Sequence, residues 1–359
     1  MNYYSLDKIV SEHAQYNMII GERSNGKTYA CLEYALRNYC QKHEASAYIR
    51  RWNEDLIGKR GASLFNNLVS NDLVRILTNG EWTDVYYYSQ RWYLCKYDEK
   101  GLMQKSNEPF CYGFALTQSE HDKSSSYPNV TTIIFDEFLT RGGYIPDEFV
   151  LFMNVISTII RLRTNVKIFM LGNTVNQYCP YFAEMGIEEV KNMQQGTIRL
   201  YSYGESGLKL AVEYCASMKS VKDNNMYFAF NNPKLNMITS GAWELDLYPH
   251  LPAKYRPADV IFTYFIEFVN DVLQCEIVQL DDGNSFTFIH RKTTPIKKND
   301  DVLYSPDYSA NRYHYRNLYK TPNRVTKVVR SYYDNDRVFY QDNMVGEIVH
   351  NYLQWCQAN

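Results

Sequence analysis

Short apolar runs recur along the first part of the chain, at residues 16–20, 130–135 and 166–171. Runs of this length in which most positions are apolar are typical of strands buried on both faces of a parallel sheet. Between them, apolar residues follow helical spacing, first at Leu32, Ala35, Leu36, Tyr39 and Cys40. Strands that alternate with helices predict an α/β domain with a mainly parallel sheet and helices on both faces.

Other segments add to this first domain. Residues 45–52 predict a second strand and residues 197–203 a final one, and a helix is expected from Pro146 to about residue 163. The aromatic run at 84–97 and the segment 110–116 predict a β-hairpin inserted into the domain.

The pattern changes after residue 207. Residues 208–256 lack a sustained period and predict a linker with one short helix. Three runs joined by tight turns predict an antiparallel meander, and helical spacing returns at 334–357. We therefore expect an α/β domain at 1–207, a linker at 208–256 and a small α+β domain at 257–359.

Composition limits the alternatives. A chain of 359 residues exceeds the ~250–300 at which single cores stop growing, which favours two domains. The net charge of −2 indicates no attraction of the whole protein to nucleic acid, so a DNA contact has to be local. No apolar stretch is long enough for a bilayer and the first residues lack a signal core, so we expect an intracellular protein without a membrane partner. Its eight cysteines lack zinc-site spacing and are expected to be reduced.

The residues that follow the first strand form a phosphate-binding loop: Gly21, Glu22, Arg23, Ser24, Asn25, Gly26, Lys27 and Thr28. Glycines allow tight turns that aim main-chain N–H groups at a phosphate, and the following helix presents its positive end to the same place. Lys27 is expected to reach the β- and γ-phosphates of ATP, and the Thr28 hydroxyl to bind Mg²⁺. The alternative is a chance match at a turn before a helix.

Asp136 and Glu137 end the run at 130–135. A carboxylate at the end of a neighbouring buried strand can hold Mg²⁺, which is the expected role of Asp136. Glu137 then faces the γ-phosphate, where it can polarise a water for attack and so favours hydrolysis over transfer to a substrate. The alternative is a pair of acids that begins a loop.

Three further residues allow two interpretations each. Arg161 and Arg163 end a helix, where cations suit the helix dipole, but either could neutralise charge on a neighbouring subunit's γ-phosphate. Asn173 could bind the attacking water or the γ-phosphate, or could simply form a turn after Gly172.

Clusters of basic residues in the second half are candidates for DNA phosphate contact, although such runs are usually solvated faces. They are Lys219, Lys222, Lys297, Lys298, Arg324, Lys327 and Arg330.

Together these motifs resemble the DNA-packaging ATPases of small short-tailed phages that replicate by protein priming. The resemblance covers much of residues 16–175 and matches the C-terminal part only loosely. Beyond the phosphate loop it is carried by Ile49-Arg50-Arg51, Gln118-Ser119-Glu120 with Lys123, Tyr127-Pro128-Asn129-Val130, the run from Thr132 to Phe138, Tyr144-Ile145-Pro146, Arg161-x-Arg163 and Gly172-Asn173.

The resemblance implies an additional-strand, catalytic-glutamate P-loop ATPase that drives double-stranded DNA into a prohead. It would work as a homomeric ring of five subunits at the portal vertex, in the host cytoplasm. Glu137 would be the catalytic base, Arg161 the cation acting across the subunit boundary, with Lys123 as a second candidate, and Asn173 a nucleotide sensor. Arg51 would sense nucleotide within its own subunit, although Asn53 stands where the family has its next basic residue.

The resemblance also implies that the second domain is a vestigial ribonuclease-H-like nuclease. Its nearby acids are Glu267, Asp271, Asp281 and Asp282, three of them in predicted turns, so we expect no cleavage. The linker and this domain would instead bind DNA or a packaging RNA. Two other functions remain open, a P-loop kinase and a nucleotide-gated structural module of the portal.

Overall fold

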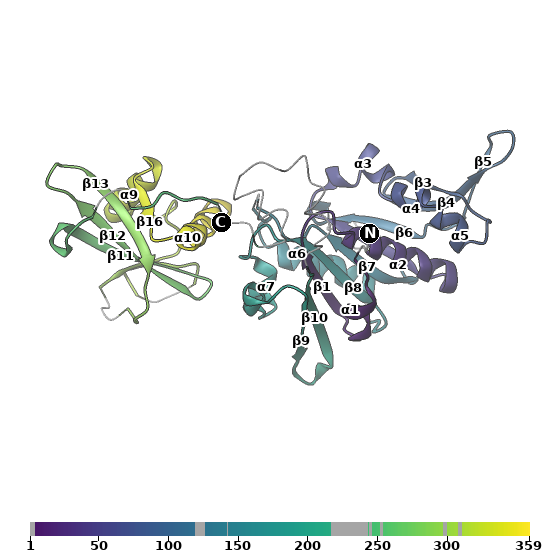
Figure 1. Ribbon diagram of the computed structural model, residues 1–359, viewed down its shortest axis with the longest axis horizontal. Coiled ribbons are helices and arrows are strands. Elements are labelled where there is room, and N and C mark those ends of the chain that lie inside the picture. Colours follow the sequence, from purple (N-terminus) through teal and green to yellow (C-terminus); the bar gives the residue numbers. More distant parts are fainter. Residues whose placement is uncertain are drawn as a thin grey trace. The chain divides into compact units, whose positions relative to one another are not determined.

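The computed structural model describes residues 4–118, 126–141, 143–216, 243, 246–251, 254–296, 300–307 and 311–359 (Figure 1). The chain divides into two compact units. The first comprises Met1–Arg141 and Asp147–Trp243, and the second comprises Gly142–Pro146 and Glu244–Asn359.

The first unit is built on a ten-stranded sheet whose central strands run parallel, in the order β6-β2-β7-β8-β1-β10. The prediction of a mainly parallel sheet is confirmed. The central strands are β1 (Tyr16–Gly21), β2 (Ala45–Arg50), β6 (Cys111–Ala115), β7 (Val130–Asp136), β8 (Lys167–Asn173) and β10 (Leu208–Tyr214).

Antiparallel strands extend both edges of this sheet. At one edge are β3 (Asp84–Tyr88), β4 (Arg91–Tyr97) and β5 (Met103–Lys105), and at the other is β9 (Thr197–Tyr203), which pairs with β10. The predicted antiparallel pairing of 84–97 with 110–116 is confirmed for β4 and β6, at Arg91–Tyr112 and Trp92–Cys111. The first segment, however, forms two strands and not one. β3 pairs with β4 through a turn at Ser89 and Gln90, both at positive φ, and β6 also joins β2 in parallel. That turn lacks the usual glycine or asparagine, so the sequence hides it.

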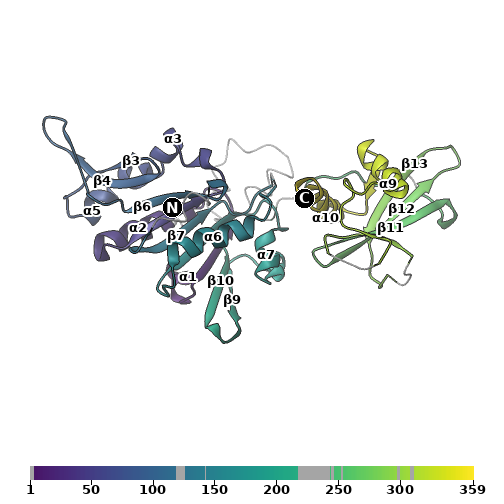
Figure 2. The same cartoon turned by 180° about the vertical axis from the view of Figure 1, so that it is seen from behind.

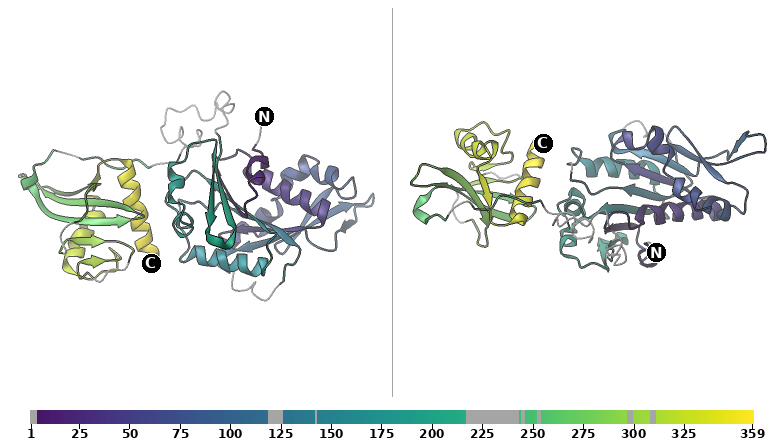
Figure 3. Two further views of the ribbon diagram at one scale, coloured as in Figure 1. Left: turned by 90° about the horizontal axis from the view of Figure 1, so that it is seen from below. Right: turned by 45° about the horizontal axis from the view of Figure 1, so that its top comes forward.

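Helices cover both faces, as predicted. Alternate residues of β7 serve opposite faces. Ile134 belongs to the same core cluster as Leu32 and Leu36 of α2, and Phe135 stacks on Phe152 of α6 with ring centroids 5.0 Å apart. In the left view of Figure 3 the purple α2 and the teal α6 lie on opposite sides of the sheet. The helices are α1 (Asp7–Ser11), α2 (Lys27–Lys42), α3 (Gly58–Ala62), α4 (Asn66–Ser70), α5 (Leu73–Leu77), α6 (Glu148–Ile160) and α7 (Pro180–Glu184).

Short 3-10 turns connect several of these elements. The turns are η1 (Asn53–Asp55), η2 (Leu116–Gln118), η3 (Glu188–Asn192), η4 (Gly204–Ser206) and, in the second unit, η7 (Pro257–Asp259). All eight cysteines are free, and every one except Cys40 is buried.

The boundary predicted at residue 207 falls inside the first unit. β10 begins at Leu208 and pairs in parallel with β1, so it belongs to the central sheet. Lys209 and Glu213 interrupt the apolar pattern of β10, so the sequence does not indicate a buried strand. Glu213 is only 8% exposed and accepts a hydrogen bond from the Tyr4 hydroxyl at 2.6 Å. Burial raises the pKa of the Glu213 carboxyl.

The second unit contains a six-stranded sheet with the order β15-β14-β11-β12-β13-β16 and, among its described residues, the helices α9 and α10, visible in green and yellow in Figure 2. The predicted antiparallel meander β11-β12-β13 is confirmed. Its elements are β11 (Val260–Phe268), β12 (Asp271–Gln279), β13 (Ser285–Arg291), β14 (Val302–Tyr304), β15 (His314–Tyr315), α9 (Arg324–Asp334), β16 (Val338–Tyr340) and α10 (Asn343–Ala358). Its relation to ribonuclease-H-like nucleases stays a prediction.

The helix predicted at 334–357 is wrong over its first part, because residues 338–340 form β16 and pair in parallel with β13. α9 and α10 each begin at a capping side chain, since Asn323 and Asp342 accept hydrogen bonds from the N–H groups of Thr326 and Val345. The predicted linker also ends earlier than 256. His250 forms an isolated β-bridge with Tyr340. The Tyr248 ring packs so closely on Gly346 that a Cβ at that position would overlap it.

One polar cluster in the second unit makes its stability depend on pH. Glu276 on β12 accepts hydrogen bonds from Tyr255 and Gln274, and its Oε1 lies 3.7 Å from His290 Nε2 on β13. The histidine lowers the pKa of Glu276 to about 2, and the carboxylate raises the pKa of His290.

We therefore expect His290→Gln to lower the melting temperature of the second unit most near pH 6. Charged His290 stabilises the fold below its unfolded pKa of ~6.5, and that contribution is lost as pH rises through the raised folded value. Glu276 contributes above its unfolded pKa of ~4.3 and loses that contribution as pH falls toward its folded value. Calorimetric scans from pH 5 to 9 should show a difference of up to about 1 kcal/mol that shrinks with rising pH. A difference independent of pH would contradict the assignment.

Candidate functional site

The phosphate-loop sequence lies where β1 leads into α2. β1 ends at Gly21, and α2 begins at Lys27 after Gly26, whose φ of 93° suits glycine. Gly21 has no room for a side chain, because a Cβ there would lie 2.8 Å from that of Cys215. The chain thus passes from a buried strand through a tight turn into the N-terminus of a 16-residue helix. That arrangement is suited to phosphate binding by main-chain N–H groups.

Lys27 is buried inside the loop, with 5% of its surface exposed. Its ammonium donates to the main-chain oxygen of Glu22 at 2.7 Å, to Asn25 Oδ1 at 3.1 Å and to Asn173 Oδ1 at 3.2 Å. Burial lowers the pKa of this ammonium. These three acceptors are uncharged, and a phosphate oxygen is a stronger partner for an ammonium than any of them.

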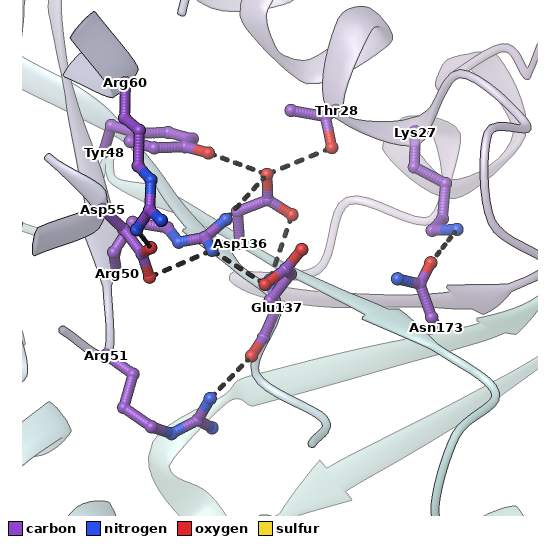
Figure 4. A network of polar contacts seen from close by, with 10 residues as sticks. All are labelled: Lys27, Thr28, Tyr48, Arg50, Arg51, Asp55, Arg60, Asp136, Glu137 and Asn173. Carbon is purple, nitrogen blue, oxygen red and sulfur yellow. Dashed lines mark hydrogen bonds and ion pairs between the residues drawn. The ribbon is translucent and has the colours of Figure 1, made fainter. Parts of the chain in front are cut away.

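Thr28 and Asp136, both predicted to hold Mg²⁺, contact each other at the edge of the sheet. The Thr28 hydroxyl donates to Asp136 Oδ2 at 3.1 Å, and the Tyr48 hydroxyl donates to the same oxygen at 2.7 Å (Figure 4). Burial and the nearby Asp136 raise the pKa of Tyr48 well above its usual value, so this hydroxyl stays protonated. Hydroxyl and carboxylate oxygens are the ligands that Mg²⁺ prefers, so these residues fit that ion.

Glu137 follows in a strained backbone conformation, with a φ of 59°. Its carboxylate is 57% exposed and accepts a hydrogen bond from Arg50 Nη2 at 2.7 Å. Arg50 also contacts Asp55 at 3.2 Å, and its Nη1 lies 3.8 Å from Asp136 Oδ2. The motifs of the sequence assign no role to Arg50. Its position at the end of β2, the strand beside β7, was the available signal.

Arg51, predicted to sense nucleotide, is buried and donates hydrogen bonds to Glu148 and to two main-chain carbonyls. Nε and Nη2 bind the two oxygens of Glu148 at 2.7 and 2.8 Å, Nη1 donates to the Glu137 carbonyl at 3.0 Å, and Nη2 donates to the Phe138 carbonyl at 2.8 Å. Charge-assisted hydrogen bonds contribute about 1.5–3 kcal/mol each, so the two bonds to the carbonyls of Glu137 and Phe138 together exceed the ~1–2 kcal/mol cost of the left-handed backbone at Glu137. Arg51 thus contacts Glu148 and the backbone of residues 137 and 138, and its role as a nucleotide sensor stays a prediction.

Asn173 lies opposite Gly21 in the parallel pairing of β8 with β1, and its amide oxygen contacts Lys27. The sequence predicted this residue beside the phosphate loop, and the structure brings the two together. Gly172, just before it, permits the close approach of the Asp136–Glu137 turn. A Cβ there would lie 2.7 Å from Leu139 Cδ1 and 2.9 Å from a ring carbon of Phe138.

The two arginines at the end of α6 differ. Arg161 is the C-cap residue in a left-handed conformation and is exposed, beside a fully exposed Leu162. Arg163 is turned back onto the main chain and cannot reach another subunit without breaking these bonds. Its guanidinium donates to the carbonyl oxygens of Tyr127, Pro128, Val130, Ile159 and Ile160. This geometry removes Arg163 from the candidates for a cation acting in trans.

Several predicted residues lie outside the described part of the chain, namely Lys123, Lys219, Lys222, Lys297 and Lys298. Arg324, Lys327 and Arg330 lie on α9 of the second unit with exposed side chains. Residues 311–337 carry seven arginines and lysines against two aspartates. Of the acids considered for a nuclease, Asp271 pairs with Arg291 and Asp281 with Arg256.

Within the described residues, no cluster of histidine, cysteine and acidic side chains has the geometry of a metal site. No helix there has both the length and the apolarity needed to cross a bilayer.

A cavity of about 250 Å³ lies next to Arg50, bordered by Tyr48, Asp55, Arg60 and Trp92.

The parallel sheet, the loop between β1 and α2, and the acids that end β7 define the P-loop class of proteins. A family model described as podovirus DNA encapsidation protein (Gp16) matches residues 1–356. The chain belongs to this family.

Curated relatives share part of the sequence. The DNA packaging protein of Bacillus phage B103 is 31% identical over 181 residues, which cover 48% of each chain. The DNA packaging protein of Bacillus phage phi29 is 30% identical over 185 residues, 50% of this chain and 49% of the relative. The matched part of the chain thus spans about half the length of these relatives.

Two solved structures are similar in fold over nearly the whole chain. The bacteriophage Phi-29 viral genome packaging motor assembly has a TM-score of 0.55 at 18% identity and covers 97% of both chains. The Phi-28 gp11 DNA packaging motor has a TM-score of 0.54 at 15% identity and covers 99% of this chain and 98% of the other.

Gly172→Ala should destabilise the protein by about 1–3 kcal/mol, because the new methyl group overlaps Leu139 and Phe138. Denaturant unfolding of Gly172→Ala, Leu139→Ala and the double variant measures this. We expect the double variant to lose less stability than the sum of the single losses, by at least about 1 kcal/mol, since the smaller side chain relieves the overlap. Additive losses would show that Gly172 does not set the distance between β8 and the Glu137 turn.

Proposed function

We propose that this protein is an ATP hydrolase that drives double-stranded DNA into a prohead, as one subunit of a homomeric ring at the portal. The observation that carries the proposal is Glu137, a largely exposed carboxylate that follows Asp136 at the edge of the sheet where Lys27 and Thr28 also lie. Membership of the encapsidation family and the names of the relatives support DNA as the substrate and the packaging motor as the assembly.

In this proposal the loop from Gly21 to Thr28 binds the phosphates of ATP, with Lys27 exchanging its amide and carbonyl acceptors for phosphate oxygens. Thr28 and Asp136 would hold Mg²⁺, which neutralises phosphate charge when bound. Asn173, already in contact with Lys27, is placed to respond to the γ-phosphate. Glu137 orients the attacking water and accepts its proton.

Glu137 has to leave Arg50 before it can accept that proton. The hydrogen bond from Arg50 Nη2 at 2.7 Å occupies a carboxylate oxygen that the attacking water would have to use. The cavity of about 250 Å³ beside Arg50 gives the arginine side chain space to move within its own subunit. We infer that the pair keeps the protein inactive until the site fills.

Arg161 is the proposed cation for the neighbouring subunit's site, because it is exposed at the end of α6 whereas Arg163 is bound to the main chain. Lys123 remains a second candidate for this role. The excess of basic residues at 311–337 supports a nucleic-acid contact on the second unit, to DNA or to a packaging RNA. The same unit is proposed to lack nuclease activity.

Glu137→Gln should lower kcat by at least about 100-fold, because glutamine cannot accept the proton, while ATP binding persists. The measurement is steady-state ATPase rate with and without duplex DNA, together with binding of a fluorescent ATP analogue. Glu189→Gln is the matched control, an exposed glutamate that also pairs with an arginine, at 3.0 Å. The wild type should be stimulated by duplex DNA. Hydrolysis that survives in Glu137→Gln, or phosphate transferred to an acceptor, would contradict the proposal.

Arg161→Ala should lower the ring's ATPase rate by about 1,000-fold if this guanidinium acts on the neighbour's phosphate. Mixing Arg161→Ala subunits with Glu137→Gln subunits should then restore part of the activity, at interfaces where an intact Glu137 meets an intact Arg161. Arg75→Ala, another exposed arginine, is the control. No recovery in mixed rings of confirmed mass would exclude the trans role.

A further inference from the structure

Two consecutive arginines bind Glu137, one at its side chain and the other at its backbone. Arg50, the last residue of β2, binds the carboxylate, and Arg51 binds the carbonyl oxygen of the same residue. Neighbouring residues at the end of a strand project to opposite faces, which explains how adjacent arginines reach different parts of one residue. The first contact involves a half-exposed group, whereas the second is inside the protein.

The hydrogen bonds to the backbone extend beyond Glu137. Arg51 also donates to the Phe138 carbonyl, and the Phe138 N–H donates to the Leu171 carbonyl at 3.1 Å. The Glu137 N–H donates to Asp136 Oδ1 at 3.0 Å. The left-handed conformation of Glu137 is therefore fixed by hydrogen bonds from both sides, which is how strained residues persist at functional sites.

Glu148 completes this arrangement. It is 2% exposed, binds Arg51 through both carboxylate oxygens and accepts a hydrogen bond from the Tyr181 hydroxyl at 2.9 Å. In the sequence, Glu148 is marked only by its place near the start of the helix expected from Pro146. Its burial against Arg51 fixes the guanidinium plane, because a bidentate pair allows one orientation. The first residue of α6 is thereby connected to the turn that carries Glu137.

We propose that Arg51 and Glu148 are positioning residues that fix the backbone of Glu137 and so aim its carboxylate at the attacking water. This inference rests on the proposed hydrolysis at Glu137. Arg51 contacts neither phosphate nor water in this role. Its effect is on the rate of the chemical step and not on the affinity for ATP.

The test compares three variants. Glu148→Gln removes the bidentate pair that fixes the Arg51 guanidinium plane, so kcat should fall while the KM for ATP stays unchanged. Arg51→Met combined with Glu148→Gln removes both buried charges together, which avoids an unpaired ion, and keeps an acceptor for Tyr181. This double variant should fold and keep its KM for ATP, but lose at least about tenfold in kcat.

Arg51→Lys provides a second route if the double variant unfolds. Lysine keeps the charge but cannot make the bidentate pair and both carbonyl bonds, so kcat should again fall with KM unchanged. Arg37→Met with Glu33→Met, an exposed pair on α2, is the matched control and should leave kcat unchanged.

Hydrogen exchange of the Phe138 amide supplies a measurement that does not need hydrolysis. It should be faster in the Arg51 variants than in wild type and unchanged in the control pair. Folded Arg51 variants with wild-type kcat and unchanged exchange would overturn the inference. A wild-type protein without ATPase activity would instead refute the proposed function.

Discussion

Strands β2, β7, β8 and β1 end at one edge of a single sheet because they pair in parallel. Each contributes to the site at that edge: β2 ends in Arg50, β7 in Asp136, β8 in Asn173, and β1 in Gly21 at the start of the phosphate loop. The register sets these positions, since Asn173 lies opposite Gly21 and Asp136 opposite Leu171. A shift of one residue between any two of these strands would separate the groups and turn each side chain to the other face.

The same edge also constrains how the site can change. Arg50 and Glu137 form an exposed contact beside a cavity, whereas Arg51, Glu148 and the backbone of residues 137 and 138 form a buried one. Breaking the first contact exposes charges that water can solvate, but breaking the second leaves a buried ion unpaired. Movement is therefore expected at the Glu137 side chain and not at its backbone. Because α6 begins at Glu148 and its C-cap is Arg161, one rigid helix connects this fixed turn to the proposed trans cation.

The sequence alone located much of this site because its signals are local. The phosphate loop, Asp136, Glu137 and Asn173 each follow an apolar run, and parallel strands place such residues together. Arg50 also ends a strand, but its partner Glu137 lies 87 residues away in sequence, so the strand end indicated a position and not a role. Arg51 and Glu148 follow no such run and lie 97 residues apart. Arg163 looked like Arg161 until its five main-chain acceptors were known, and β10 was missed because Lys209 and Glu213 interrupt its apolar pattern. In the second unit, the meander was readable from its turns, but the short parallel strands β14, β15 and β16 carry too few residues to show a period.

The central claim is that ATP binding frees Glu137 from Arg50 while Arg51 keeps its backbone in place. A structure of the full chain with Mg²⁺ and a slowly hydrolysed ATP analogue tests this most directly. The account predicts the γ-phosphate at the Lys27 ammonium, the ion between Thr28 and Asp136, the Glu137 carboxylate away from Arg50, and the Arg51 bonds to both carbonyls intact. A nucleotide bound at this loop with Glu137 still paired to Arg50, or with the Arg51 bonds broken, would contradict it.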